Sequence, residues 1–429
     1  MRHVGAVLLR TSGPDYRFEP GVSDIDLTVI HGADGDAETL AFLEEFWSAY
    51  RQLKSWLPML GEVEILSVDE FAFSARMAPR LAKIQKTYVP VSITRTFSGK
   101  DTLEAAMRLA PVEPAVPHML AFVCMKFTTA ILPRTLAVRA QPTVVHRKRL
   151  DRQLSTAGET LSKALARLGV DGTEPGASTD AWMRRAAKFY GDLARCSATL
   201  AQTAFGPERH AIPPRAVDVP DELQHLASRV FGDLEVSLLW SRPICFPQTL
   251  AMVVVTEDEL EPAGFTSVVD RLLRFRREVP ASLRPLLSGN LALRHFRVDG
   301  WPFMMPRSMF RFFAELSPFY FPSFSLSQRP SLGGAPLEMI AASRSTCVRE
   351  TLLHYCSFLS LKNNWQHATT AEARLALYRA TIDYSEGFAS VARGSALTPS
   401  VAHNPNMTLL DAYRELQQSL HRLRQALGV

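Results

Sequence analysis

The chain has 429 residues, of which 47% are hydrophobic and 21% charged, a composition that excludes an intrinsically disordered protein. One hydrophobic core rarely holds this many residues, so we expect two to four domains. The formal net charge of +5 suits a phosphate-bearing partner but is too small to indicate nucleic-acid binding by itself.

Cysteine usage and the most apolar segment bear on location. The five cysteines are scattered along the chain and form no Cys-x-x-Cys pair, which argues against a zinc ribbon or a disulfide framework and predicts reduced thiols in the cytoplasm. No signal peptide is evident before the first predicted strand. Residues 118–132 are the most apolar stretch, and we expect a buried helix there that is too short to span a membrane.

The first two predicted elements are strands over 4–10 and 21–30, separated by a turn and a loop. The second strand carries Asp24 and Asp26 between apolar residues. Successive side chains of a strand point to opposite faces, so both carboxylates should lie on one face. Neighbouring acids on one face repel each other, so a cation should lie beside them, and a divalent metal with oxygen ligands is the natural candidate.

A helix over 37–57 and a strand over 61–66 are predicted next, and the strand carries Glu62 and Glu64. Another short helix and another strand follow before residue 94. Strands that alternate with helices in this way predict an α/β or α+β layer with a mixed sheet.

These elements resemble the nucleotidyltransferase superfamily of the DNA polymerase β type over roughly the first 95 residues. That family has a Gly-Ser turn, about a dozen further residues, an Asp-x-Asp strand and a third acid on a later strand. The matching residues of this chain are, in order, Thr11, Ser12, Asp24, Asp26 and Glu64. Glu62 is the weaker candidate for the third acid, because Gly61 precedes it.

The resemblance implies a metal-dependent transfer of a nucleotide. Asp24, Asp26 and Glu64 are then the catalytic acids and the ligands of Mg²⁺ or Mn²⁺, in a site where metal ions stabilise the attacking and leaving oxygens. Our leading hypothesis is an enzyme that moves a nucleotide, AMP from ATP, onto a small hydroxylated molecule or onto a protein.

The turn after the first strand is where the nucleoside triphosphate should bind. Ser12, Thr11, Arg10 and Arg17 are the candidates for contact with its phosphates, since backbone amides and basic side chains in a turn attract anions. Thr11 stands where the family has glycine, and a β-branched residue reaches positive φ only at a cost.

Two alternatives to the leading hypothesis stay open. The replacement of glycine by Thr11 favours a catalytically inactive binding or scaffold protein with the same fold, whereas the retained acids favour an enzyme. An RNA-modifying nucleotidyltransferase is compatible with the net charge, but the basic residues form only two separate clusters, so nucleic acid is not the favoured partner.

Beyond the nucleotidyltransferase-like domain over 1–100, three further regions are expected. These are a helical domain over 101–206, a second, smaller α/β region over 221–335 without its own metal site, and a C-terminal helical region over 336–429. The order strand, helix, strand recurs in the third region, but no Asp-x-Asp and no convincing sequence repeat supports a duplication.

Overall fold

The structure is a computed structural model that describes residues 3–11, 24–77, 87–94, 97–109, 114–172, 180–204, 211–242, 249–287, 303–316, 324–327, 337–394 and 403–429. It has mixed sheets and many helices, which confirms the predicted α/β (α+β) class. The described residues divide into two compact units. The first is drawn from Met1–Pro114 and Cys347–Val429, and the second from Ala115–Leu291 and Phe296–Thr346.

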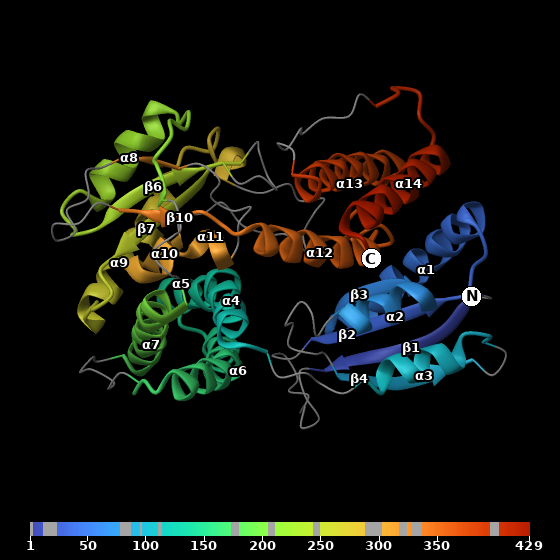
Figure 1. The fold of residues 1–429 in the computed structure, drawn as a ribbon, viewed down its shortest axis with the longest axis horizontal. Coiled ribbons are helices and arrows are strands. Elements are labelled where there is room, and N and C mark those ends of the chain that lie inside the picture. The colour runs from blue at the N-terminus through green and yellow to red at the C-terminus, as the bar shows by residue number, and fades with distance from the viewer. Residues whose placement is uncertain are drawn as a thin grey trace. The chain divides into compact units, whose positions relative to one another are not determined.

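A four-stranded mixed sheet forms the centre of the first unit (Figure 1). Its order is β3-β2-β1-β4, made of β1 (Val4–Thr11), β2 (Ile25–His31), β3 (Leu60–Ser67) and β4 (Thr87–Ile93). Strand β1 pairs antiparallel with β2 and β4, whereas β2 and β3 are parallel. A parallel pair needs a crossover connection, and helix α1 (Asp36–Trp56) supplies it.

Five further helices belong wholly or mainly to this unit: α2 (Val68–Met77), α3 (Lys100–Met107), α12 (Arg344–Leu361), α13 (Ala371–Ala392) and α14 (Leu409–Leu427). The buried faces of these helices and of α1 are rich in aromatic residues, because only sizeable apolar side chains fill the space between packed layers. The buried aromatic residues of these helices include Phe42, Trp47, Tyr50, Phe71, Tyr378 and Tyr413, and buried Trp365 lies between α12 and α13.

The C-terminal helices join the N-terminal sheet through buried polar groups. Trp47 Nε1 donates a hydrogen bond to the Asn363 carbonyl at 2.9 Å, and Asn363 Nδ2 donates to the Ile65 carbonyl at 3.0 Å. Lys362 forms an ion pair with Glu70 and is almost fully buried. The structure therefore places in one unit two regions that the sequence suggested as separate domains. Periodicity reveals that a helix has an apolar face but not which element covers it.

Helical segments dominate the first part of the second unit. A continuous helix runs from Val116 to Ala140 through α4 (Val116–Lys126), a π-helical turn (Phe127–Ile131) and α5 (Leu132–Ala140). It is longer than the predicted 118–132. Among the described residues it is the one helix long and apolar enough to cross a membrane by length and composition. Many of its side chains instead belong to the hydrophobic core of the unit, namely Met119, Leu120, Val123, Cys124, Phe127, Ile131, Leu132, Leu136 and Val138.

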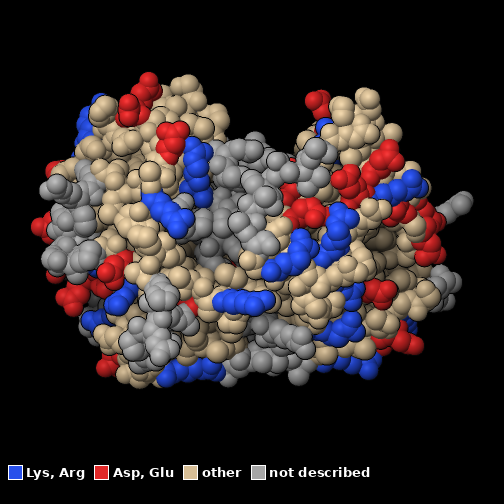
Figure 2. Space-filling model, turned by 45° about the horizontal axis from the view of Figure 1, so that its top comes forward, with Lys and Arg blue, Asp and Glu red and all other residues tan. Residues whose placement is uncertain are grey.

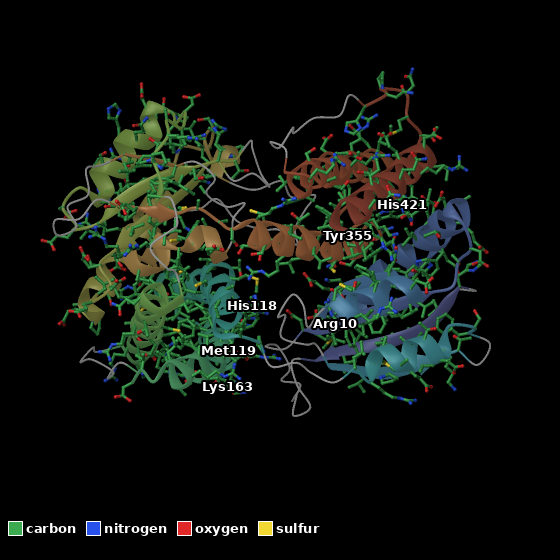
Figure 3. All side chains as sticks on the ribbon, viewed as in Figure 1. Arg10, His118, Met119, Lys163, Tyr355 and His421 are labelled. Carbon is green, nitrogen blue, oxygen red and sulfur yellow. The ribbon has the colours of Figure 1, made fainter. Side chains whose placement is uncertain are left out.

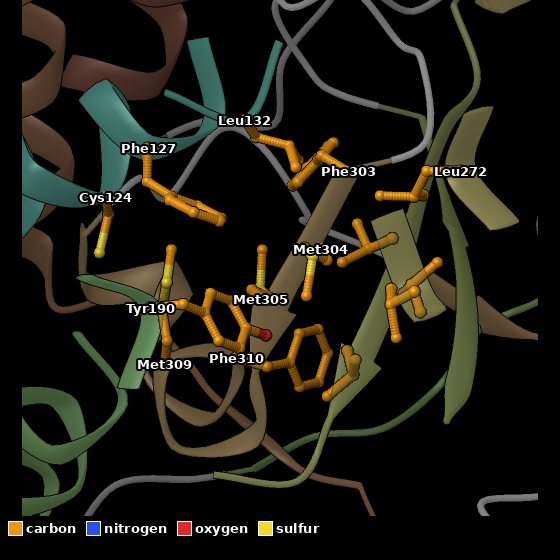
Figure 4. Close-up of a cluster of buried hydrophobic side chains, with 14 of the residues drawn as sticks. Cys124, Phe127, Leu132, Tyr190, Leu272, Phe303, Met304, Met305, Met309 and Phe310 are labelled. Carbon is orange, nitrogen blue, oxygen red and sulfur yellow. The ribbon is translucent and has the colours of Figure 1, made fainter. Parts of the chain in front are cut away.

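Other elements enclose that core. Helices α6 (Val144–Leu168), α7 (Ala181–Ala204), α8 (Asp221–Phe231) and α9 (Pro262–Glu278) pack around it. Two short strands, β5 (Ala211–Ile212) and β10 (Met339–Ile340), pair with each other. Figure 4 shows part of the core, where Tyr190, Met304, Met305 and Phe310 pack together.

A second four-stranded sheet lies in this unit, with the order β8-β7-β6-β9. Its strands are β6 (Ser237–Ser241), β7 (Ala251–Thr256), β8 (Phe303–Pro306) and β9 (Phe324–Leu326). Strand β6 is antiparallel to β7 and β9, and β7 is parallel to β8. Helix α9 connects β7 to β8, and α10 (Arg307–Arg311) begins directly after β8, as α2 does after β3.

The two sheets therefore share strand order, strand directions and the position of the crossover helix. The correspondence extends to the pairing of single residues. Ser241 of β6 pairs with both Ala251 of β7 and Phe324 of β9, as Arg10 of β1 pairs with both Asp26 of β2 and Tyr88 of β4. The fold of the first unit's sheet thus recurs in the second unit without a recognisable sequence repeat.

Candidate active site

A single arginine stands at the centre of the acidic residues of the first sheet. Strand pairing places Arg10 of β1 opposite Asp26 of β2, so their side chains lie on the same face. Arg10 Nη1 lies 2.6 Å from Glu64 Oε1, and Nη2 lies 3.3 Å from Glu62 Oε2 and 3.7 Å from Asp26 Oδ2. Figure 3 labels Arg10 on β1. A cation beside the acids is therefore present, and it is a guanidinium.

Burial differs strongly among these charged groups. The Arg10 side chain is only 4% exposed and that of Glu64 17%, whereas Asp26 and Glu62 are 40% and 53% exposed. Burial alone would lower the pKa of Arg10, but the charges of Glu64, Asp26 and Glu62 outweigh it and raise that pKa above its ordinary value. Arg10 therefore stays charged, and Glu64 is its most buried partner.

Gly61 allows the two aspartates to approach the backbone of β3. A methyl group on Gly61 would lie 2.3 Å from Asp26 Oδ1 and 2.9 Å from Asp24 Cβ, distances that no packed atoms tolerate. Asp26 Oδ1 also accepts a hydrogen bond of 2.8 Å from the amide of Glu62. Asp24 is exposed and directly precedes β2. Both aspartates thus sit against the start of β3.

Two tyrosines that sequence reasoning did not identify border the acids. The Tyr50 hydroxyl donates to the Gly61 carbonyl at 2.7 Å, and burial, assisted by Asp26 and Glu62, raises its pKa to about 12. Tyr88 of β4 is the direct pairing partner of Arg10 of β1, and burial, followed by the charge of Glu64, raises the pKa of Tyr88 as well. Both phenols are therefore neutral at physiological pH. Only their aromatic character could have drawn attention to them in the sequence.

The other predicted site residues fall at the edge of the described region or beyond it. Ser12 and Arg17 lie outside the residues that the structure describes. Thr11 is the last residue of β1, and its side chain is not described. The predicted contacts with phosphate stay predictions. Glu62, which the sequence ranked below Glu64, contacts Arg10 as Glu64 does.

The acids have the right chemistry for a divalent metal, although Arg10 already occupies the place where they meet. Carboxylate oxygens are the ligands that Mg²⁺ prefers. Three acids, Asp26, Glu62 and Glu64, lie beside one guanidinium, so negative charge is in excess, and Asp24 lies close by against Gly61. Among the described residues, no group of three or more His, Cys, Asp and Glu side chains has a geometry ready to hold a metal. Binding would require the carboxylates to turn partly away from Arg10.

Where the structure describes them, the equivalent positions of the second sheet carry none of these charges. Ser241 pairs with Ala251 where Arg10 pairs with Asp26, and Phe303 pairs with Val253 where Glu64 pairs with Thr28. The acids that follow β7 have a structural partner instead: Asp258 accepts a hydrogen bond of 2.8 Å from the amide of Ser308. The first sheet thus has both Arg10 and its acidic partners, whereas the described strands of the second sheet have neither at the equivalent positions.

Comparison of the chain with protein-family models, with curated proteins and with solved structures gives no match. The surface adds one observation. On the face drawn in Figure 2, Lys and Arg side chains are interspersed with Asp and Glu side chains and with uncharged surface.

Proposed function

We propose that this chain is a Mg²⁺-dependent nucleotidyltransferase that uses Asp24, Asp26 and Glu64. The observation that carries the proposal is the gathering of acids from two neighbouring strands, β2 and β3, around one cation on a single face of a mixed sheet. This arrangement agrees with the Asp-x-Asp strand and the later acidic strand on which the family resemblance rests.

The residues around the acids support a role for each part of the site. Asp24, Asp26 and Glu64 would hold Mg²⁺ or Mn²⁺, which, when bound, stabilises negative charge on the attacking and leaving oxygens. Arg10 presents a permanent positive charge two residues before Ser12, where the phosphates are expected. Tyr50 and Tyr88 stay neutral, so they add no charge to the site. The nucleotide is AMP from ATP, and the acceptor a small hydroxylated molecule or a protein in the cytoplasm.

One observation favours a second candidate function. The buried ion pair of Arg10 with Glu64 already neutralises part of the acidic site without any metal, and such a pair suits a catalytically inactive member of the fold that acts as a binding or scaffold protein. The RNA-modifying alternative has less support, because the described Lys and Arg side chains on the face drawn in Figure 2 are interspersed with Asp and Glu side chains.

Thermal unfolding tests the proposed function. A ligand that binds only the native state raises the melting temperature, so Mg²⁺ with ATP should raise it in the parent protein and should not in the double variant Asp24→Asn/Asp26→Asn. GTP, CTP and UTP with Mg²⁺ show which base is preferred. An equal response of the parent and the double variant would place any nucleotide outside this site.

A further inference from the structure

We propose that Arg10 is a built-in counter-cation that limits divalent-metal binding at Asp26 and Glu64. In this view, which rests on the proposed function, Arg10 holds the acids together when no metal is bound and competes with the metal for them. Arg10 is thus a positioning residue that sets how much divalent cation the site needs.

The position of Arg10 in the sheet keeps its guanidinium at the acids. Strand β1 is an inner strand, paired with β2 on one side and β4 on the other, so the backbone of Arg10 is fixed from both directions. Its side chain is almost fully buried and contacts Glu64, Glu62 and Asp26. Removing such a group from its partners would leave a buried charge uncompensated.

The charges themselves explain the competition. Without metal, the neighbouring carboxylates of Asp26, Glu62 and Glu64 would repel one another, and the guanidinium offsets that repulsion. A divalent cation that binds the same carboxylates must approach a like charge in a partly buried site, where Coulomb interactions are stronger than in water. It must also replace ion pairs that are already formed. Both effects lower the affinity for metal.

The second sheet supports this interpretation independently. With the same topology, it has Ser241, Ala251 and Phe303 at the positions of Arg10, Asp26 and Glu64. A guanidinium needed only to fix the strand pairing would have a counterpart there. The second sheet lacks both the arginine and the acids at these positions, which indicates that Arg10 is there to neutralise the acids and is not required for the strand pairing.

Titration with Mn²⁺, followed through the electron paramagnetic resonance signal of the free ion, measures metal affinity without any need for activity. The parent is compared with Arg10→Gln, which removes the charge, and Arg10→Lys, which keeps it. Arg422→Gln is the matched control, since Arg422 pairs with Glu386 on the C-terminal helices and its loss changes net charge equally. We expect Arg10→Gln to bind Mn²⁺ at least about tenfold more tightly than the parent, with Arg10→Lys and Arg422→Gln close to the parent.

The outcomes separate this inference from the proposed function. Equal affinity of the parent and Arg10→Gln would overturn the role of Arg10 while leaving metal-dependent catalysis intact. Binding by Arg10→Gln but not by the parent would support the role of Arg10 and overturn the proposed function in favour of the inactive candidate. Binding by neither would overturn both. If Arg10→Gln does not fold, Arg10→Gln/Glu62→Gln is compared with Glu62→Gln alone, and the same gain is expected between these two variants, because they differ only at Arg10.

Discussion

Arg10 Nη1 lies 2.6 Å from Glu64 Oε1, although β2 separates their strands in the sheet. Neighbouring strands are about 4.8 Å apart, so the two backbones are separated by roughly twice that distance. The long arginine side chain covers this distance and meets Asp26 on the way. One guanidinium thereby connects the side chains of three strands.

Removal of the buried partner of Arg10 should destabilise the first unit. Glu64→Gln leaves the guanidinium with only the more exposed acids, and we expect a loss of about 1–3 kcal/mol in the free energy of unfolding. Glu62→Gln is the control: because Glu62 is 53% exposed, its loss should cost less than about 1 kcal/mol. Urea unfolding measures both. Equal costs would show that burial does not determine the strength of these ion pairs.

Gly61 should not tolerate a side chain. Gly61→Ala would push a methyl group onto Asp26 Oδ1 and Asp24 Cβ, so we expect a loss of about 1–3 kcal/mol together with weaker Mn²⁺ binding. Gly158→Ala is the control, because a methyl group at this helical position meets no atom within 4 Å, and alanine favours a helix. Wild-type Mn²⁺ affinity in a stable Gly61→Ala protein would show that the aspartates do not form the metal site.

His31, at the end of β2, should make the first unit sensitive to acid. Burial lowers the pKa of His31 to about 4. Nearby Glu70 opposes this shift, whereas Lys362 and His3 add to it. As the pH falls, His31 takes up a proton near pH 6.5 in the unfolded chain but only near pH 4 in the folded chain. The contribution of neutral His31 to the free energy of unfolding is therefore complete above pH 6.5 and is lost as the pH falls toward 4. We expect the free energy of unfolding to fall by about 2–3 kcal/mol between pH 7 and pH 4.5 for this reason.

The variant His31→Phe keeps an aromatic ring against Phe42, whose centroid lies 5.6 Å from that of His31, and should lose this part of the pH dependence. His421→Asn, on the exposed face of α14, should retain it. Parallel urea unfolding at the two pH values provides the measurement. An identical pH dependence for His31→Phe and the parent would mean that His31 binds its proton equally well in the folded and the unfolded chain.

The ion pair of Lys362 with Glu70 should couple the C-terminal helices to the sheet. Lys362 also donates to Gln417 at 3.0 Å and is almost fully buried. Lys362→Met should therefore cost about 3 kcal/mol, because it leaves Glu70 without this partner in a half-buried place. The double variant Lys362→Met/Glu70→Gln should recover part of that loss, and a thermodynamic cycle measures the coupling. Additive effects would argue against a stabilising role for the pair.

The sequence predicts the local part of this account but not the long-range part. The positions of β1, β2 and β3, and the place of Glu64 on β3, are predicted correctly, since the formation of each strand depends on residues that are neighbours in the sequence. The contact of Arg10 with Glu64 depends on the register of three strands, which alternation does not determine. In the sequence, Gly61 is the reason to rank Glu62 below Glu64 as the third acid. In the structure, its missing side chain lets Asp24 and Asp26 approach the backbone of β3.

The shared topology of the two sheets could not be predicted for a related reason. The positions that carry charge in the first sheet carry Ser241, Ala251 and Phe303 in the second, so no motif recurs. Likewise, the apolar run at 118–132 does not reveal that the helix continues past Pro133. Proline normally interrupts a helix because it lacks a backbone N–H, but here a π-helical turn precedes it and the helix goes on to Ala140.

Transfer of label from α-³²P nucleoside triphosphates tests the central claim most directly. The parent and Asp24→Asn/Asp26→Asn are incubated with Mg²⁺, each nucleotide and a cell extract, and products are separated into small molecules, protein and RNA. We expect the parent, but not the double variant, to move label from ATP onto a small molecule or a protein. Absence of labelled product with every nucleotide, or equal labelling by the double variant, would contradict nucleotidyl transfer at this site.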